Sequence, residues 1–193
     1  MRKKIVPILF ITLLGIFTLI SCAEPNDDMD STNTISPIAA NEAQLGDFKA
    51  QDINGNEVTK DIFSNYDLTL VNLFTTWCSP CVEEIPYLSQ IDKELSAKGV
   101  NVIGIVLDVN EDGKIDDKKL EKLKEIIQST NAGYDILLPD SVLREGRLKG
   151  VDSVPESFFV DKNGNIVGET YVGSHSKEEW IDIINKELDK IKK

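Results

Sequence analysis

Two cysteines three positions apart, Cys78 and Cys81, form the motif with the most specific chemistry in the chain. They follow an apolar, strand-like run that begins at Leu68, and the segment after them is predicted to be a helix. In the first turn of a helix, unpaired backbone N–H groups and the positive end of the helix dipole stabilise a thiolate, so Cys78 is predicted to be the nucleophile. Cys81 lies one turn further on, close enough to close a small disulfide ring with it. The spacing therefore predicts thiol–disulfide exchange by this pair.

Half of a zinc site has the same Cys-x-x-Cys spacing, and its other half needs a second pair of cysteines or histidines. The chain of 193 residues has three cysteines and one histidine. These are too few for a four-ligand zinc site of that kind, so the composition favours redox chemistry.

The length of the chain allows one domain of ordinary size with additional segments. Its formal net charge of -12 argues against a nucleic-acid partner and against electrostatic attraction to anionic lipid headgroups. The composition does not identify a substrate.

The N-terminus has the pattern of a bacterial lipoprotein signal. A basic start at residues 2–4 precedes an apolar run over residues 5–20, and Leu19-Ile20-Ser21-Cys22 resembles the site at which the cysteine is lipidated. We therefore expect residues 1–21 to be a signal peptide and Cys22 to carry a lipid. The alternative is an uncleaved transmembrane helix, although the apolar run is shorter than the roughly 20 residues that span a bilayer. Both alternatives place the rest of the chain outside the cytoplasm.

Residues 22–45 are rich in Asn, Asp, Ser, Thr and Pro and poor in large apolar residues, so they are predicted to be a flexible, lipidated tether. The domain is then residues 46–193, in which strand patterns alternate with helical patterns. Strands are predicted around the Asn54-Gly55 turn and at 68–75, 100–108, 134–138, 156–160 and 166–172; helices are predicted at 80–97, 116–130, 141–148 and from 176 onward. Pro86 is expected to kink the first of these helices, and Ser176 with Glu179 forms a capping-box pattern at the start of the last. This order predicts an α/β fold with helices covering a mixed sheet.

Three segments carry a family resemblance: LVNLFTTWCSPC at 70–81, EIP at 84–86 and SVPESFFVDKNG at 153–164. Together they resemble the membrane-anchored, extracytoplasmic thioredoxin-like proteins of the ResA and TlpA group, over about residues 45–188. The resemblance implies a thioredoxin-like fold, here with an N-terminal hairpin extension, and a disulfide between Cys78 and Cys81. It also implies that Pro155 is a cis-proline facing this disulfide and that Val154 offers backbone hydrogen bonds to a substrate.

A cis X-Pro bond beside the reactive sulfur exposes backbone groups with which a bound peptide pairs as an added strand. Judged from the residues alone, Pro155 would more often be a trans-proline at the start of a strand. Trp77 is expected to form one wall of the partner-binding surface, although simple packing would also explain a tryptophan there.

Asn72 lies six residues before the first cysteine, where cytoplasmic thioredoxins carry a buried aspartate, and an amide cannot exchange a proton. In the pattern of the related proteins, a glutamate three residues after the second cysteine lies near the thiols, and Glu84 matches it. A partly buried carboxylate there would raise the pKa values of the cysteines and move the proton of Cys81. The alternative for Glu84, and even more for Glu83, is a solvated acid near a helix N-terminus.

A calcium loop is a weaker prediction for the acidic segment 108–119. Asp108, Asn110, Asp112 and Asp116 have the spacing of oxygen ligands in such a loop. The twelfth position is Lys119 instead of a bidentate acid, and an acidic turn that caps the next helix would explain the same residues.

Two rival functions remain open. His175 together with the two cysteines suggests a copper-binding chaperone of similar fold, although the usual cysteine spacing of such proteins is longer by one residue. Thr75 and Cys78 have the T-x-x-C spacing of thiol peroxidases, but Val71 stands where those enzymes are expected to have proline.

The function expected from these patterns is that of an extracytoplasmic, lipid-anchored thiol–disulfide oxidoreductase that reduces protein disulfides. No flavin or nicotinamide motif is present, so no cofactor is expected. The resemblance implies a membrane dithiol as electron donor, and as substrates apocytochrome c, sulfoxide-reducing enzymes or envelope proteins with incorrect disulfides. The chain is expected to be a monomer.

Overall fold

The computed structural model describes residues 44–192. The predicted signal peptide, the lipidation site at Cys22 and the tether as far as residue 43 lie outside the described residues. Gln44 and Leu45, which the predicted tether included, belong to the folded part. Gln44 forms a β-bridge with Asn165, and Leu45 is 4% exposed.

A mixed seven-stranded sheet forms the centre of the described domain, with the strand order β2-β1-β5-β4-β3-β6-β7. The strands are β1 (Lys49–Asp52), β2 (Glu57–Thr59), β3 (Leu68–Phe74), β4 (Val100–Val106), β5 (Asp135–Leu138), β6 (Glu156–Asp161) and β7 (Ile166–Val172). β3, β4 and β5 are parallel, whereas the β1–β2 hairpin, β6 and β7 pair antiparallel with their neighbours. The predicted α/β class and the N-terminal hairpin are confirmed.

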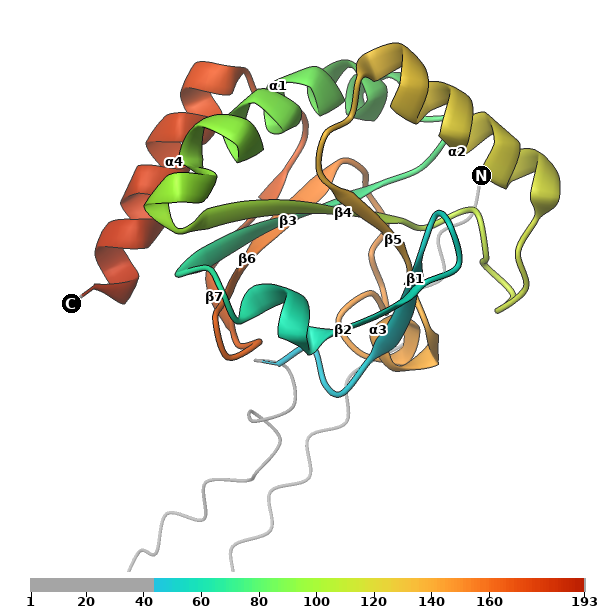
Figure 1. Cartoon of the computed structure of the whole chain (residues 1–193), viewed down its shortest axis with the longest axis horizontal. Coiled ribbons are helices and arrows are strands. Elements are labelled where there is room, and N and C mark those ends of the chain that lie inside the picture. Colours follow the sequence, from blue (N-terminus) through green and yellow to red (C-terminus); the bar gives the residue numbers. More distant parts are fainter. Residues whose placement is uncertain (1–43, 193) are drawn as a thin grey trace, which may run out of the picture. The chain divides into compact units, whose positions relative to one another are not determined.

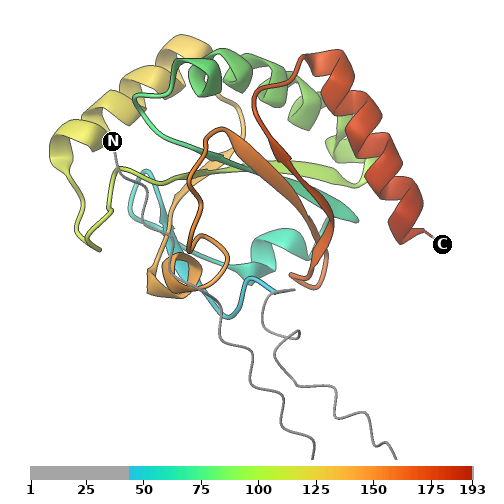
Figure 2. The same cartoon turned by 180° about the vertical axis from the view of Figure 1, so that it is seen from behind.

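β3 and β4 are buried along their whole length because both faces of the sheet are covered. Helices α1 (Ser79–Leu95), α2 (Asp117–Thr130) and α4 (Lys177–Ile191) lie along one face, and α3 (Ser141–Glu145) lies on the other (Figures 1 and 2). The short 3-10 helix η2 (Lys60–Phe63) also lies on the α3 side, and η3 (Ser96–Lys98) follows α1.

Each face of the sheet has its own hydrophobic core. The core under α1, α2 and α4 contains Leu88, Leu123 and Trp180. The core under α3 and η2 contains Phe63 and Phe158. Cys78 and Cys81 pack into the first of these cores, so α1 and α4 both contribute to their surroundings.

The α1 helix begins where the sequence places it, and Pro80 in its first turn requires no lost backbone hydrogen bond. Pro86 lies inside the helix without ending it, and the predicted kink stays a prediction. At the end of η3, Gly99 has a φ of 81°, and a Cβ at this position would lie 2.8 Å from the carboxylate of Asp67. The chain therefore leaves η3 at a position where the positive φ and the nearby carboxylate favour glycine.

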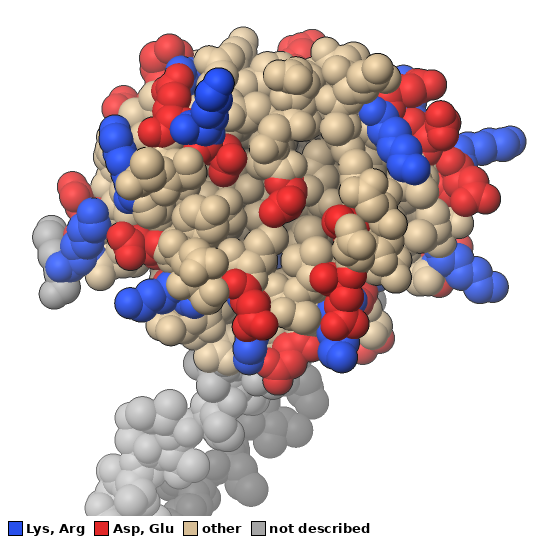
Figure 3. All heavy atoms as spheres, viewed as in Figure 1, with Lys and Arg blue, Asp and Glu red and all other residues tan. Residues whose placement is uncertain are grey.

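The capping box at the start of α4 is confirmed: the hydroxyl of Ser176 accepts from the backbone N–H of Glu179, whose carboxylate accepts from the N–H of Ser176. The predicted helix 141–148 is shorter, because α3 ends at Glu145 and Gly146 leaves the helical conformation. Over residues 44–192, no helix has both the length and the apolar character needed to cross a membrane. Acidic and basic side chains are interspersed around the face of the domain in Figure 3.

Candidate active site

Cys78 and Cys81 form a disulfide at the junction between β3 and α1. Cys78 is the N-cap residue of α1, and its sulfur accepts a hydrogen bond from the backbone N–H of Cys81 at 3.3 Å. Cys78 is 5% exposed, whereas Cys81 is fully buried. The helix N-terminus favours a thiolate at Cys78, and of the two cysteines only Cys78 has exposed surface. The geometry thus agrees with Cys78 as the attacking residue and Cys81 as the resolving one.

The segment before β6 lies against the disulfide. The Val154–Pro155 peptide bond is cis, as the family resemblance implied. The carbonyl oxygen of Val154 is 3.7 Å from the sulfur of Cys78. The carbonyl of Pro155 accepts from the N–H of Gly173 at 2.9 Å, which ties this segment to the end of β7. The main chain at Val154 therefore lies directly beside the sulfur that is reached from outside.

Trp77 is 71% exposed and stands next to Cys78. It lines a groove of about 530 Å³ that runs between the start of α1 and α2, with Cys78, Val82 and Ile126 among the other residues of its walls. The groove combines an aromatic ring and aliphatic side chains beside a disulfide.

Asp108, which the sequence predicted as a calcium ligand, holds the loop before the cysteines instead. Asp108 follows β4 and is 2% exposed. Its carboxylate accepts from the backbone N–H of Thr76 at 3.0 Å and from the hydroxyl of Thr76 at 2.6 Å. Because Thr76 lies two residues before Cys78, these two bonds fix the segment that presents the sulfur. An acid directly after a buried strand, at the sheet edge where the cysteines lie, was the signal that could have indicated this role.

The structure does not bring the calcium candidates together. Asp108 is bonded to Thr76, and Asp116 caps α2 by accepting from two backbone N–H groups. The amide of Asn110 donates to the carbonyl of Pro139 and accepts from Arg144. Across residues 44–192, no three or more His, Cys, Asp and Glu side chains are grouped to hold a metal ion. The acidic turn instead caps a helix and braces two loops.

Glu84 lies one turn after Cys81 on α1 and is 1% exposed. One carboxylate oxygen, Oε1, accepts from the backbone N–H of His175 at 2.7 Å and from the indole N–H of Trp180 at 2.8 Å. The other, Oε2, accepts from the amide of Asn72 at 3.2 Å. The solvated alternative for Glu84 is thus excluded by its burial, whereas Glu83 is exposed as expected.

Burial raises the pKa of Glu84 above its usual value, and the hydrogen bonds from His175, Trp180 and Asn72, together with the nearby imidazole, oppose this rise. All three hydrogen-bond donors are neutral groups. Without a cation bonded to it, the carboxylate stays easier to protonate than an exposed one. A buried acid of this kind, one turn from a cysteine, is suited to proton transfer.

The residues behind the two rival functions are placed as follows. His175 is half-buried and packs against Trp180, with ring centroids 4.8 Å apart. It joins neither cysteine in a metal-binding group among the described residues. Thr75 is buried, and its hydroxyl has no hydrogen-bond partner in the described part of the chain.

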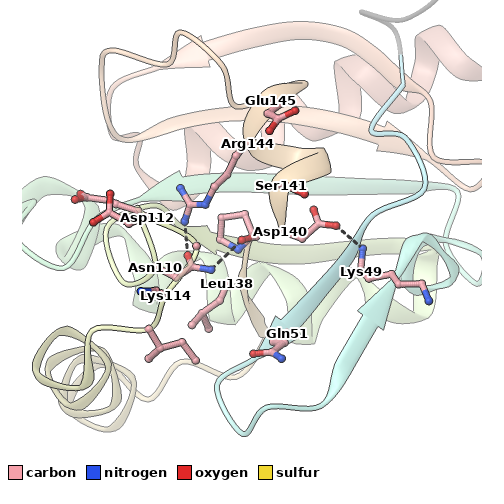
Figure 4. A pocket seen from close by; sticks show the side chains of 14 residues that line it. Lys49, Gln51, Asn110, Asp112, Lys114, Leu138, Asp140, Ser141, Arg144 and Glu145 are labelled. Atoms are coloured by element: carbon pink, nitrogen blue, oxygen red, sulfur yellow. Dashed lines mark hydrogen bonds between the residues drawn. The ribbon is translucent and has the colours of Figure 1, made fainter.

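A larger pocket of about 820 Å³ lies at the same end of the parallel strands, on the side of the hairpin (Figure 4). Lys49, Lys114 and Arg144 line it together with Asp112 and Asp140, so its walls carry both charges. The bonds drawn there join the residues of the wall to each other, such as the backbone of Lys49 to Asp140. They connect β1, α3 and the loop after β4.

Comparisons with known proteins agree with this site. The model of the AhpC/TSA family matches residues 42–168. The chain is 26% identical over 142 residues to the thiol-disulfide oxidoreductase ResA of Bacillus thuringiensis, covering 72% of this chain and 73% of the relative.

Solved structures are also similar to this chain, including one from Chlorobium tepidum and one from Streptococcus pneumoniae. A thioredoxin-family thiol:disulfide interchange protein from Chlorobium tepidum is 25% identical, with a TM-score of 0.60 over 76% of this chain and 97% of the other. The exposed lipoprotein thioredoxin Etrx1 of Streptococcus pneumoniae is 22% identical, with a TM-score of 0.57 over 72% of this chain and 98% of the other. The family model matches most of the chain, the fold is thioredoxin-like, and Cys78 and Cys81 form a disulfide. The chain therefore belongs to the AhpC/TSA family and is a thiol–disulfide oxidoreductase.

Proposed function

We propose that this oxidoreductase works outside the cytoplasm, anchored by a lipid on Cys22, and reduces disulfides of other proteins. The unequal burial of the two cysteines supports Cys78 as the residue that attacks the substrate, since Cys81 is fully buried and Cys78 is not. The lipoprotein-like pattern at residues 19–22 supports the location. A similar structure belongs to a protein described as an exposed lipoprotein.

In the proposed reaction, the thiolate of Cys78 attacks a disulfide of the substrate, which forms a mixed disulfide and releases one substrate thiolate. Cys81 then loses its proton, and its thiolate attacks the sulfur of Cys78. The second substrate thiolate leaves, and the enzyme keeps the disulfide seen between Cys78 and Cys81. Two electrons pass from the enzyme to the substrate, whose two thiolates take protons from water.

Glu84 takes the proton of Cys81 in this proposal. It follows Cys81 by one helical turn, so the two side chains lie on the same side of α1. When an electron donor reduces the disulfide again, Cys81 leaves as a thiolate and recovers a proton. A membrane dithiol is the proposed donor, since the chain carries no flavin or nicotinamide motif.

The substrate is proposed to bind as an extended segment beside Val154, with Trp77 covering the adjoining residues. Main-chain pairing at Val154 would hold substrates of varied sequence next to Cys78. Apocytochrome c, sulfoxide-reducing enzymes and misoxidised envelope proteins are the substrate classes that the family suggests, and the enzyme is proposed to act as a monomer.

The test uses a Cys81→Ser variant, which forms the mixed disulfide but cannot resolve it. We expect this variant to accumulate covalent complexes with its substrates that reducing agent releases, and the wild-type protein to reduce insulin. Cys78→Ser is the matched control and should trap nothing. A wild-type protein that leaves insulin intact but turns over hydrogen peroxide would favour the peroxidase alternative.

The anchor has a separate test. The intact mass of the mature protein from membranes should correspond to a chain that begins at Cys22 and carries lipid, and Cys22→Ser should abolish the modification. A retained Met1 with unmodified Cys22 would contradict the lipid anchor.

A further inference from the structure

The side chain of Asn72 lies between Glu84 and β6 in a fully enclosed position. Asn72 is 0% exposed, and Glu84 and Ser157 are each 1% exposed. The amide nitrogen of Asn72 donates to Oε2 of Glu84 at 3.2 Å and to the hydroxyl oxygen of Ser157 at 3.0 Å. The amide oxygen of Asn72 is buried without a hydrogen-bond partner in the described structure. The nitrogen of this buried amide thus donates two hydrogen bonds, whereas its oxygen accepts none. A buried oxygen without a hydrogen-bond partner destabilises the folded state.

The two oxygens of Glu84 are not equivalent as proton acceptors. Oε1 already accepts two hydrogen bonds, from the backbone of His175 and the indole of Trp180. Oε2 accepts one, from Asn72. A proton taken up by Glu84 therefore goes to Oε2. The new O–H group would then face the donating nitrogen of Asn72, although a buried O–H requires an acceptor.

We propose that the side-chain amide of Asn72 flips when Glu84 takes up a proton, so that its oxygen and nitrogen exchange places. After this flip, called the turn below, the oxygen accepts from the O–H of Glu84 and from the hydroxyl of Ser157. The inference rests on the proton transfer proposed for Glu84 above, and it makes Asn72 a positioning residue for that step. With Glu84 charged, Asn72 donates; with Glu84 neutral, Asn72 accepts. The turn places the N–H groups of Asn72 where its oxygen had no partner, so one unpaired end of the amide is exchanged for the other. The two ends have nearly the same shape, so the turn requires no change in packing.

The proton balance involves only groups already named and water. The S–H bond of Cys81 breaks as the O–H bond on Oε2 of Glu84 forms. The disulfide form of the structure, in which Asn72 donates, corresponds to Glu84 after it has released this proton to water, and Cys81 takes up a proton through Glu84 when the disulfide is reduced. The titratable groups that act electrostatically near Glu84 are His175, in the loop before α4, and Tyr134, before β5. Neither donates a side-chain hydrogen bond to Glu84 in the described structure, whereas Asn72 does.

Nuclear magnetic resonance of the oxidised, isotope-labelled protein tests the turn directly. The carboxyl carbon of Glu84 reports its titration. Nuclear Overhauser contacts report whether the amide protons of Asn72 are near the γ protons of Glu84 and the β protons of Ser157. We expect these contacts when Glu84 is charged. As the pH falls they should disappear, with the same midpoint as the titration of Glu84. Contacts that persist unchanged through that titration would overturn the proposal.

A second variant separates a turning amide from a fixed donor. A fixed donor stabilises only the charged form of Glu84, so Asn72→Leu would raise the pKa of Glu84 by about one unit or more. A turning amide is a partner for both forms, and we expect Asn72→Leu to change the pKa of Glu84 by less than about half a unit. The control is Thr69→Val, because the hydroxyl of Thr69 is buried on the same strand without a partner among the described residues. It should leave the pKa of Glu84 unchanged.

Glu84→Gln provides an independent check, because its amide nitrogen imitates the protonated oxygen. In this variant the Asn72 contacts should be absent at every pH. Their presence would count against the turn. These measurements use the resting oxidised protein, so their outcome is independent of the insulin assay: loss of insulin reduction would reject the proposed function, and unchanged Asn72 contacts would reject the turn.

Discussion

Two buried glutamates, Glu84 on α1 and Glu187 on α4, show how hydrogen-bond partners decide the role of an acid. Glu84 and Glu187 are each 1% exposed, and Trp180 and Glu187 lie two turns apart on the same side of α4. Glu84 accepts only from neutral donors. Glu187 accepts from the ammonium group of Lys190 at 2.9 Å and from the hydroxyl of Tyr171 at 2.6 Å.

A bonded cation holds a buried carboxylate in its charged form, whereas neutral donors alone leave protonation accessible. The hydroxyl of Tyr171 is affected in turn, since burial and the hydrogen bond to Glu187 raise its pKa. Glu187 thus joins α4 to β7, whereas Glu84 lies one turn from a reactive sulfur. Burial alone therefore does not identify a proton-transferring acid; the kind of partner does.

The largest expected effect concerns the structural glutamate. Gly168 has a φ of 71°, and a Cβ there would overlap the carboxylate of Glu187. Gly168→Ala should therefore lower the free energy of unfolding by about 2–4 kcal/mol, measured by urea denaturation. Gly113→Ala is the matched control, because Gly113 has a φ of 72° but nothing within 4 Å of its Cβ position. Equal losses in the two variants would show that the contact with Glu187 is unimportant.

The next effect separates the two acids by activity. Glu84→Gln cannot accept a proton and should slow resolution of the mixed disulfide by about 10–100-fold at neutral pH. Glu187→Gln should leave the rate per folded molecule within about twofold, since a residue outside the site loses no transition-state contact. Stopped-flow kinetics with a model disulfide measures both. Equal slowing in the two variants would contradict the assignment.

A smaller effect extends the comparison to a third buried acid, Asp108. Asp108→Asn keeps an acceptor for Thr76 but loses the charge, and we expect a loss of about 1–2 kcal/mol in the free energy of unfolding. A double-mutant cycle with Thr76→Val should give a coupling energy of about 1–2 kcal/mol. The exposed Asp112, in the same loop, supplies the control Asp112→Asn. If the losses in the free energy of unfolding caused by the Asp108 and Thr76 changes are additive, Asp108 does not stabilise the loop through Thr76.

The smallest effect is a pH dependence of stability. Since burial raises the pKa of Glu84 in the folded state above its usual value of 4.5, the folded state binds this proton more tightly than the unfolded chain. The resulting stabilisation is complete below pH 4.5 and is lost as the pH rises through the raised pKa.

Urea denaturation of the wild type and of Glu84→Gln over this range measures the difference. The wild type should gain stability relative to the variant as the pH falls. A difference that does not change with pH would show that the folded and unfolded pKa values are the same.

Local patterns predicted most of the fold. The helix start at the cysteines, the capping box at Ser176 and the alternation of strands and helices depend on neighbouring residues, which a sequence displays directly. The cis bond before Pro155 was expected only from the family resemblance, because a local pattern favours the trans form.

The surroundings of the site could not be predicted in the same way. The donors to Glu84 from His175 and Trp180 come from about 90 residues away, and their approach depends on how α4 packs over α1. Asp108 has the spacing of a calcium ligand, yet its carboxylate accepts from Thr76, in the loop that follows the neighbouring strand β3. Spacing along the chain does not say which helices and strands lie side by side, and that arrangement decided both roles.

The two tryptophans of the chain have opposite surroundings: Trp77 is 71% exposed beside Cys78, and Trp180 is fully buried with its indole N–H on Glu84. An excited indole next to a disulfide loses its emission by electron transfer to the sulfurs, and an indole bonded to a carboxylate responds to that group's charge. The ultraviolet fluorescence of the unlabelled protein would therefore be an internal gauge of both events of the proposed cycle, the opening of the sulfur bridge and the arrival of the proton at Glu84.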